Sequence, residues 1–384
     1  MSTPNMMIKS IFYTLFLFSI CSCQSQKIKS NKKLPCDKEA TVETINLYNN
    51  LFSLQEKGIM FGQQDALAYG VNWKYEEGRS DIKDVTGDHP AIYGWDLGGT
   101  EHNSPNDIDG VPFDKMKRWI GEIYDRNGVN TISWHMDNPF TGKNAWDITS
   151  NSFASILPNG SKHELYKKWL DNSIVFFNSI KGKDGKKVPI LFRPFHELTG
   201  TWFWWCQNNA TPEQFKEVWK FTVEYYQSKG VHNLIYVYNT SDFNSKEEFM
   251  KYYPGDDYVD MISFDKYLYN DPTKDNSFVE KCQLQFKIMD EVANERGKIT
   301  AFAETGYEQI PYDKFWTKTL INAIGNYKTS FVLAWRNHGW QESENKMHYY
   351  VPFKGHPNEK DFVDFYNLEK TLFQKDVSKL NLYK

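Results

Sequence analysis

The sequence contains few cysteines and no strong excess of either charge. Only 5 of the 384 residues are cysteine, and 45 Lys+Arg stand against 49 Asp+Glu, which gives a formal net charge of −4. Without a basic excess or a polybasic arm, the chain has no electrostatic means of holding a phosphate backbone. We therefore expect no nucleic-acid partner.

The cysteines that lie outside the N-terminal segment are too sparse for a disulfide framework. Cys36, Cys206 and Cys282 are widely spaced, and none of them belongs to a Cys-x-x-Cys pair. This spacing indicates neither a cysteine-bound zinc site nor a thioredoxin-like motif. One disulfide among the three and buried free thiols are both open.

Aromatic residues, in contrast, are abundant. The chain has 13 Trp, 23 Tyr and 27 Phe, which together make 16% of the residues, within a composition of 40% hydrophobic and 24% charged residues. The overall composition is that of a folded protein whose length can bury a large core. Most of the rings belong in that core, but flat rings also stack on the apolar faces of sugars. A sugar-handling enzyme is therefore open.

An apolar run near the N-terminus predicts export. Lys9 precedes residues 11–20, a run that has the length of a signal-peptide core and is too short to span a bilayer. It ends in Ile-Cys-Ser-Cys, which resembles a bacterial lipoprotein box in which Cys23 becomes the acylated first residue. Ordinary signal-peptidase cleavage nearby is the alternative. The expected organisation is a signal peptide at 1–22, a tether at 23–36 and one folded domain at 37–384.

The expected location follows from the lipoprotein box. Cys23 would anchor the protein to the bacterial outer membrane, and the membrane would be contacted only through this lipid. The residues that follow, 24–27, carry no acidic run of the kind associated with surface export. We therefore expect the periplasmic face rather than the cell surface.

Eight short runs rich in β-branched and aromatic residues alternate with longer amphipathic stretches. The predicted strands are Ile59–Gln63, Ala91–Leu97, Asn130–His135, Val188–Phe195, Asn233–Asn239, Tyr258–Phe264, Ile299–Ala303 and Ser330–Trp335. The predicted helices are Phe113–Arg126, His163–Ile180, Pro212–Lys229, Phe278–Arg296 and Tyr312–Ile324, with only a weak helical pattern before His89. This alternation predicts a single-domain α/β fold, a (β/α)₈ TIM barrel. The alternative, an open doubly wound sheet, lacks a Gly-rich phosphate turn after any early strand.

Polar or reactive side chains follow most of the predicted strands. In a barrel these ends converge on one rim, where active sites lie. The groups concerned are Gln63-Gln64-Asp65, Asp96, Trp134-His135, residues 193–197, Asp265-Lys266-Tyr267, Glu304 and Trp335-Arg336. A single acid at a strand end often caps the next helix, but this many groups on one rim indicate a catalytic site.

Two of these groups, Glu197 and Glu304, close the fourth and seventh strands. Glycoside hydrolysis needs two carboxyl groups that flank the scissile bond, and a separation near 5–5.5 Å is the retaining arrangement. Glu197 precedes an aromatic loop, residues 198–205, which would keep its proton on as a general acid requires. Glu304 should be held ionised by polar partners such as Tyr267 and Arg336, as a nucleophile requires.

The segment Arg-Pro-Phe-His-Glu-Leu-Thr-Gly-Thr-Trp-Phe-Trp-Trp at 193–205 resembles the acid/base signature of glycoside hydrolase family 26, whose members are mostly β-mannanases. Ala303-Glu304-Thr305-Gly306 resembles the nucleophile strand of the same family. Trp134-His135, residues 264–267 and Trp335-Arg336 also match, so the resemblance covers roughly residues 40 to 375.

The resemblance implies a mannan endo-1,4-β-mannosidase type of enzyme, although chain-internal and chain-end cleavage stay open. It would hydrolyse mannan, galactomannan or manno-oligosaccharides by double displacement, with Glu197 as acid/base and Glu304 as nucleophile. The same resemblance assigns sugar binding to His135, His196, Trp202, Asp265, Tyr267, Trp335 and Arg336. Trp134 and Trp204 are interpreted as core residues.

No cofactor or metal is expected. His135 and His196 could form a zinc pair, but no third ligand has suitable spacing. Residues 106–110, Asn-Asp-Ile-Asp-Gly, lack the terminal glutamate of a calcium loop and are interpreted as a turn. We expect a monomer.

Two alternatives stay open. A β-1,3-xylanase or a mixed-linkage β-glucanase would share the catalytic pair. A non-catalytic glycan-binding lipoprotein would keep the aromatic cleft, but it would have no need for both glutamates.

Overall fold

The computed structural model describes Met1 and residues 33–384, and Lys33–Lys384 form one compact unit. The predicted signal peptide, Cys23 and most of the predicted tether lie outside the described residues. None of the described helices is both long enough and apolar enough to cross a membrane.

Eight parallel strands form a closed barrel, as the sequence predicts. The hydrogen-bonded order is β10-β9-β8-β7-β6-β5-β4-β1, and β1 pairs with β10 to close the ring. The strands are β1 (Ile59–Gln64), β4 (Ile92–Asp96), β5 (Val129–Ser133), β6 (Ile190–Arg193), β7 (Leu234–Thr240), β8 (Met261–Leu268), β9 (Ile299–Tyr307) and β10 (Phe331–Ala334). A short ninth strand, β13 (Thr371–Leu372), adds to β1.

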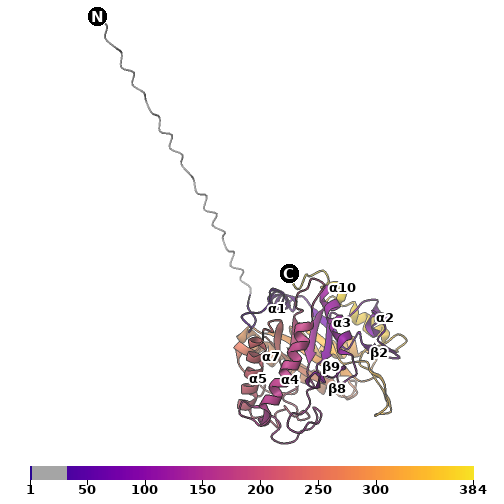
Figure 1. The fold of residues 1–384 in the computed structure, drawn as a ribbon. Helices are drawn as coiled ribbons and strands as arrows, with labels where there is room; N and C mark the ends of the chain where they lie inside the picture. The colour runs from indigo at the N-terminus through magenta and orange to yellow at the C-terminus, as the bar shows by residue number, and fades with distance from the viewer. Residues whose placement is uncertain (2–32) are drawn as a thin grey trace. The chain divides into compact units, whose positions relative to one another are not determined.

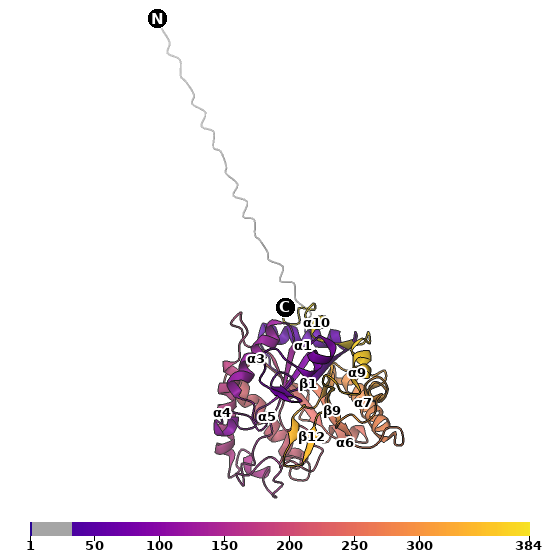
Figure 2. The ribbon, with the colours of Figure 1, turned by 90° about the vertical axis from the view of Figure 1, so that its right-hand side faces the viewer.

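Helices surround the strands on all sides in the two views of Figures 1 and 2. The α-helices are α1 (Val42–Leu54), α2 (Asp81–Thr86), α3 (Phe113–Asp125), α4 (His163–Ser179), α5 (Pro212–Ser228), α6 (Lys246–Met250), α7 (Ser277–Arg296), α8 (Ile321–Ile324), α9 (Glu359–Tyr366) and α10 (Gln374–Val377). Short 3₁₀ turns occur at Thr100–His102, Ala154–Ile156 and Asp256–Tyr258. The start of α5 shows how the sequence sets a boundary: Thr211 and Gln214 form a capping box around Pro212.

One predicted helix starts differently from its pattern. The stretch predicted at 312–324 begins as a π-helical segment, Phe315–Leu320, before α8. Asp361 of α9 accepts the backbone N–H of Trp316 at 2.9 Å and that of Thr317 at 3.3 Å. A carboxylate from a distant helix therefore satisfies the first amides, which the local sequence does not reveal.

Two short antiparallel hairpins were not predicted. They pair β2 (Tyr69–Gly70) with β3 (Trp73–Lys74) and β11 (Gly339–Gln341) with β12 (Lys346–His348). Strands of two or three residues are too short to show an alternating pattern. Figure 2 shows β12 at the end of the barrel opposite to α1 and α10.

The described chain enters at the amino-terminal ends of the strands. The backbone N–H of Cys36 donates to Asp260, immediately before β8, at 2.6 Å, and its Sγ lies 3.3 Å from the same carboxylate. Cys36, Cys206 and Cys282 are all free thiols. Cys36 therefore packs at the amino-terminal end of β8, at the opposite end of the barrel from the carboxyl ends where active sites lie.

Candidate active site

The carboxyl ends of the barrel strands surround a cavity of about 260 Å³. It is lined by His135, Trp146, His196, Glu197, Trp202, Phe203, Tyr267, Tyr269, Glu304 and Trp335. Most of the predicted site residues therefore meet in one place. The exceptions are Asp265, which lies buried beside the cavity, and Arg336, which belongs to a neighbouring ion pair.

Glu197 lies in the turn that follows β6. Both Phe195 (φ 54°) and Glu197 (φ 53°) adopt the left-handed backbone region, which non-glycine residues seldom occupy outside constrained sites. Trp202 Nε1–H donates to Glu197 Oε2 at 2.6 Å. A Cβ on Gly200 would lie 2.6 Å from the indole, so a glycine there lets Trp202 fold back onto the carboxyl group.

The environment of Glu197 favours its protonated form. Burial, followed by the negative charge of Glu304, raises the pKa of Glu197 to about 7, against the opposing effects of Trp202 and His135. A carboxyl group with that pKa is half protonated at neutral pH and can donate a proton to a leaving oxygen.

Glu304 is held by two donors. Arg193 Nη2 lies 2.6 Å from Oε1, and the Tyr267 hydroxyl donates to Oε2 at 3.0 Å. A shift of register between β8 and β9 places Asp265 opposite Glu304, whereas Phe264 faces Phe302. This irregularity re-aims the side chains of β9 at the cavity, a common role of β-bulges beside active sites.

The arginine that contacts Glu304 is Arg193 and not Arg336, which corrects the expectation from sequence. Arg193 ends β6, is fully buried, and also contacts Asn239 at 2.9 Å and Asp265 at 3.4 Å. Arg336 lies beyond the end of β10, and its Nη2 pairs with Asp109 at 3.1 Å. Asp109, the carboxylate that pairs with Arg336, lies in the loop after the second barrel strand, β4.

Three carboxylates converge in the site. One oxygen from each of Glu197, Asp265 and Glu304 lies within 4.8 Å of the other two. Burial and the neighbouring Glu304 raise the pKa of Asp265 well above its usual range. Arg193 already contacts Glu304 and Asp265, so this cluster has its own cation and does not need a metal ion to balance its charge.

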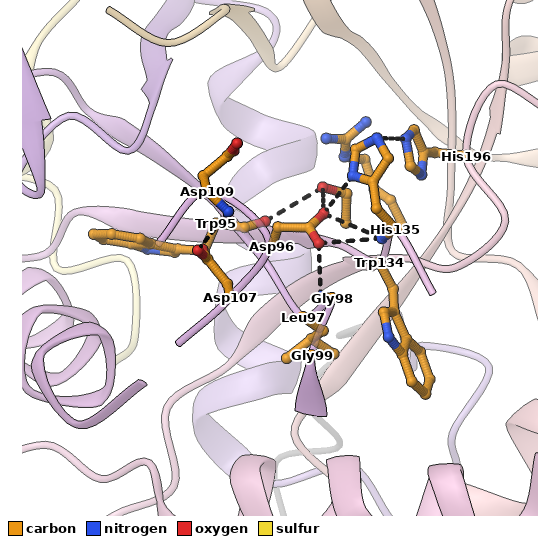
Figure 3. A network of polar contacts seen from close by, with 12 residues as sticks. Trp95, Asp96, Leu97, Gly98, Gly99, Asp107, Asp109, Trp134, His135 and His196 are labelled. Atoms are coloured by element: carbon orange, nitrogen blue, oxygen red, sulfur yellow. Dashed lines mark hydrogen bonds and ion pairs between the residues drawn. The ribbon is translucent and has the colours of Figure 1, made fainter. Parts of the chain in front are cut away.

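His135 and His196 lie side by side at the cavity wall. Their Nε2 atoms are 3.2 Å apart, and His135 Nδ1 is 2.8 Å from Asp96 Oδ2 (Figure 3).

Two other sequence interpretations agree with the structure. Residues 106–110, interpreted as a turn, form one, because Asp107 Oδ1 accepts the backbone N–H groups of Asp109 and Val111. Trp134 and Trp204 are buried, as the interpretation of both as core residues requires.

Sequence reasoning placed Asp96 and Arg193 at the rim without giving them a role, and it did not identify Asn239, Trp146 or Tyr269. Arg193 holds Glu304, Asn239 contacts Arg193 and Asp265, and Asp96 contacts His135. Trp146 and Tyr269 line the cavity. A signal existed for Arg193 and Asp96, because both end barrel strands. Trp146 and Tyr269 lie in loops, where no periodic pattern marks them.

Two further cavities are lined by residues at or beyond the carboxyl ends of the barrel strands. On the side of β10, a cavity of about 480 Å³ lies between the two hairpins and is lined by Tyr69, Gly70, Asn72, Trp73, Lys74, Asp109, His338, Gly339 and Trp340. On the side of β8, a cavity of about 320 Å³ shares Tyr267 and Tyr269 with the catalytic one. The cavity around Glu197 and Glu304 therefore borders a second one on the β8 side through two shared tyrosines.

The chain is similar to known proteins over most of its length. The family model for glycosyl hydrolase family 26 matches residues 36–341. A mannan endo-1,4-β-mannosidase from Bifidobacterium adolescentis is 29% identical over 357 residues, which cover 88% of this chain and 35% of that protein. One from Bacillus subtilis is 27% identical over 339 residues, which cover 81% of this chain and 83% of that protein. The chain thus spans about a third of the first relative and most of the second.

Solved structures show the same fold. A GH26 β-mannanase from Bacteroides ovatus superposes with a TM-score of 0.85 at 37% identity, covering 90% of this chain and 98% of that one. GH26C from a Muricauda species superposes with a TM-score of 0.82 at 31% identity, covering 91% and 96%.

Proposed function

The chain belongs to glycosyl hydrolase family 26, and we propose that it is a retaining β-1,4-mannanase that cleaves within mannan or galactomannan chains. The observation that carries the mechanism is the pairing of two glutamates in different environments. Glu197 is partly buried beside Trp202 with a pKa of about 7, and Glu304 accepts from Arg193 and Tyr267. One carboxylate oxygen of each lies within 4.8 Å of the other, close to the retaining spacing of about 5–5.5 Å between carboxyl groups.

In the first step, a Glu304 oxygen attacks the anomeric carbon while Glu197 gives its proton to the departing glycosidic oxygen. The bond between the sugar and the leaving chain breaks, and a glycosyl ester of Glu304 forms. Arg193 and Tyr267 hold Glu304 in line for the attack, so little reorganisation is needed as its charge is lost.

In the second step, Glu197 acts as a base. It takes a proton from a water molecule, whose oxygen attacks the anomeric carbon and releases Glu304. Two inversions give a product with the starting configuration. Esterification of Glu304 removes its negative charge, so the pKa of Glu197 falls when a base is needed.

Sugar recognition is assigned to the rings and polar groups that line the cavities. Trp202 and Trp335 offer flat apolar faces beside the catalytic pair. The cavity on the β8 side, which shares Tyr267 and Tyr269 with the central one, would accept a neighbouring sugar unit, which supports cleavage inside a chain rather than only at its end. The names of the relatives from Bifidobacterium and Bacillus support the same substrate.

Product analysis on a set of polysaccharides tests the substrate. Mannan and galactomannan are expected to give a mixture of manno-oligosaccharides from the first minutes, whereas laminarin, xylan and mixed-linkage glucan stay intact. Faster hydrolysis of a xylan or a glucan would replace the mannanase assignment with the corresponding family activity. Binding of mannan without hydrolysis would leave a glycan-binding protein.

The Tyr267 hydroxyl tests how Glu304 is oriented. Tyr267→Phe is expected to lower kcat by roughly 10²-fold and to change KM much less, because the donated hydrogen bond follows the charge change on Glu304 in the transition state. Steady-state kinetics on manno-oligosaccharides measure this split. Tyr350→Phe, which removes a hydroxyl from the ring packed edge-on against Tyr267, is the control and should leave kcat intact. An unchanged kcat in Tyr267→Phe would make Tyr267 a packing residue.

The general-acid role proposed for Glu197 predicts how kcat/KM depends on pH. The general acid must be protonated, so kcat/KM is expected to fall as the pH rises through about 7. Because the charge of Glu304 raises this pKa, infrared titration of Glu197 should give a lower value in Glu304→Gln than in the wild type. Glu101→Gln, which removes another buried glutamate away from the cavity, should leave the value unchanged. An equal or higher value in Glu304→Gln would mean that the two carboxyl groups are not close neighbours.

We also propose that Cys23 carries a lipid, which would hold a monomeric enzyme at the periplasmic face of the outer membrane. Support comes from the sequence Ile-Cys-Ser-Cys alone. Metabolic labelling with a fatty-acid analogue should mark the wild type and not Cys23→Ala. Labelling of neither protein would overturn the anchor.

A further inference from the structure

Asp96 is a buried carboxylate that does not itself line the cavity of the candidate site but contacts His135, which does. Asp96 ends β4 and is 1% exposed. Figure 3 shows Asp96 with dashed lines from its carboxylate to Gly98 and His135. Oδ1 accepts the backbone N–H of Gly98 at 2.7 Å and that of His135 at 3.1 Å. Oδ2 accepts the Ser133 hydroxyl at 2.8 Å and lies 2.8 Å from His135 Nδ1.

This arrangement fixes the direction of the bond between Asp96 and His135. Two partners of the carboxylate are backbone N–H groups and a third is a hydroxyl, so the carboxyl group acts as an acceptor throughout. Although burial opposes ionisation, His135 and these hydrogen bonds hold the pKa of Asp96 below its usual range. A carboxylate that only accepts requires a proton on His135 Nδ1.

Gly98 lets the backbone N–H that it donates come close to Asp96. A Cβ on Gly98 would lie 2.9 Å from Asp96 Oδ1 and 2.8 Å from the carbonyl oxygen of His135. Only glycine allows this approach of the backbone. The His135 ring is then clamped against Trp146, with ring centroids 5.3 Å apart and planes inclined by 17°, and against the edge of Phe203 at 5.1 Å.

The other nitrogen of His135 faces His196. Burial and the adjacent His135 lower the pKa of His196 well below its ordinary value of 6.5, so His196 is neutral. Its Nδ1 is buried without a hydrogen-bond partner. A neutral His196 can accept from His135 through Nε2 at 3.2 Å, which leaves the second proton of the pair on His135.

We propose that Asp96 is a positioning residue: it fixes the proton on His135 Nδ1 and keeps the His135 imidazole cationic where it faces the two catalytic glutamates. The inference rests on the roles proposed for Glu197 and Glu304. It follows that the pKa of Glu197 is set by two neighbouring charges and not by Glu304 alone. Glu304 raises the pKa of Glu197 and the His135 cation lowers it, so Asp96 acts through His135 to keep Glu197 able to give a proton and to take one back.

The charges around His135 agree with this assignment. Burial lowers the pKa of His135, but Asp96 of β4, Glu304 of β9 and Asp109 of the loop after β4 together raise it above 6.5. On the loop after β6, His196 is neutral and Glu197 adds negative charge when ionised. Arg193 of β6 opposes a second proton on His196.

Asp96→Asn separates positioning from packing, because asparagine keeps the shape and removes the charge. Its amide group would face His135 Nδ1 as a donor, so that nitrogen should lose its proton and the ring should become neutral. The alkaline limb of kcat/KM should then move upward by about one pH unit, the effect of losing one nearby cation. Asp107→Asn is the matched control: burial with Asp65 and Asp109 raises the pKa of Asp107 to about 10, so asparagine resembles its neutral form. This variant should keep the wild-type limb.

Nitrogen NMR of histidine-labelled protein without substrate gives the direct readout, with the His135 signal assigned by its loss in His135→Gln. In the wild type, His135 should carry a proton on Nδ1 and stay doubly protonated above pH 6.5, the ordinary pKa of histidine. In Asp96→Asn, His135 should lose its second proton below pH 6.5. A wild-type His135 that is neutral at pH 6.5 would overturn the proposal, whether or not Asp96→Asn folds. So would a folded Asp96→Asn with the wild-type histidine titration and pH profile. This readout needs no substrate, so its failure is distinct from failure of the mannanase assignment.

Discussion

Glu304→Ala is expected to lose hydrolysis of every substrate, by on the order of 10⁴-fold or more in kcat, the scale of loss that follows removal of a covalent nucleophile. The reason is chemical and not structural: without the Glu304 oxygen no glycosyl ester forms. Kinetics on manno-oligosaccharides and on an aryl β-mannoside with a good leaving group should show the same loss, because leaving-group quality cannot replace the nucleophile.

The control for this variant lies on the same side of the barrel. Glu308 pairs with Lys346 at 2.9 Å and His348 at 2.8 Å, outside the catalytic cavity. Glu308→Ala should keep near wild-type turnover.

Azide added to Glu304→Ala can occupy the space of the missing side chain and attack the same face of the sugar, which gives a glycosyl azide of inverted configuration. Substantial hydrolysis of mannan by Glu304→Ala would remove Glu304 from the nucleophile role.

Glu197→Ala should show a different loss that depends on the leaving group. Polysaccharide hydrolysis should fall by on the order of 10²–10⁴-fold, because the departing sugar oxygen receives no proton. An activated aryl mannoside needs no proton to leave, so its aryl group should be released in a rapid burst equal to the enzyme present. The second step then stalls, since no base activates water.

Azide distinguishes the two glutamates most sharply. In Glu197→Ala, azide attacks the glycosyl ester of Glu304 from the opposite face and gives a glycosyl azide of retained configuration, the reverse of the product from Glu304→Ala. Proton NMR of the two azides reads the difference. Near wild-type activity of Glu197→Ala on mannan would show that another group supplies the proton.

The barrel could be predicted from sequence because each of its strands is a short buried run. Residues such as Ile92, Ile132 and Val332 are fully buried, and the β-branched, aromatic character of these segments reports that directly. The meeting of Glu197 and Glu304 in one cavity could be predicted too, since both residues come just after or near the end of such runs. The strand boundaries differ from the prediction by up to a few residues, as hydrophobicity does not mark where pairing stops.

The details of the site could not be predicted because they depend on contacts between distant segments. Arg193 and Arg336 each follow a buried run, and the sequence does not show which one reaches Glu304. The register shift that sets Asp265 opposite Glu304 belongs to the pairing of two strands and leaves no mark on either alone. The same holds for Asp96, whose role appears only when His135 of the next strand end is placed beside it.

The central claim is that Glu304 becomes covalently bound to the sugar, and trapping of that ester tests it most directly. Glu197→Ala is mixed with an activated aryl β-mannobioside, quenched in acid within the burst, and analysed by intact mass and peptide mapping. The account predicts an increase equal to one mannobiosyl group per protein, carried by the peptide that contains Glu304. A label on another residue would contradict it, as would release of the aryl group without any adduct and with an inverted first product.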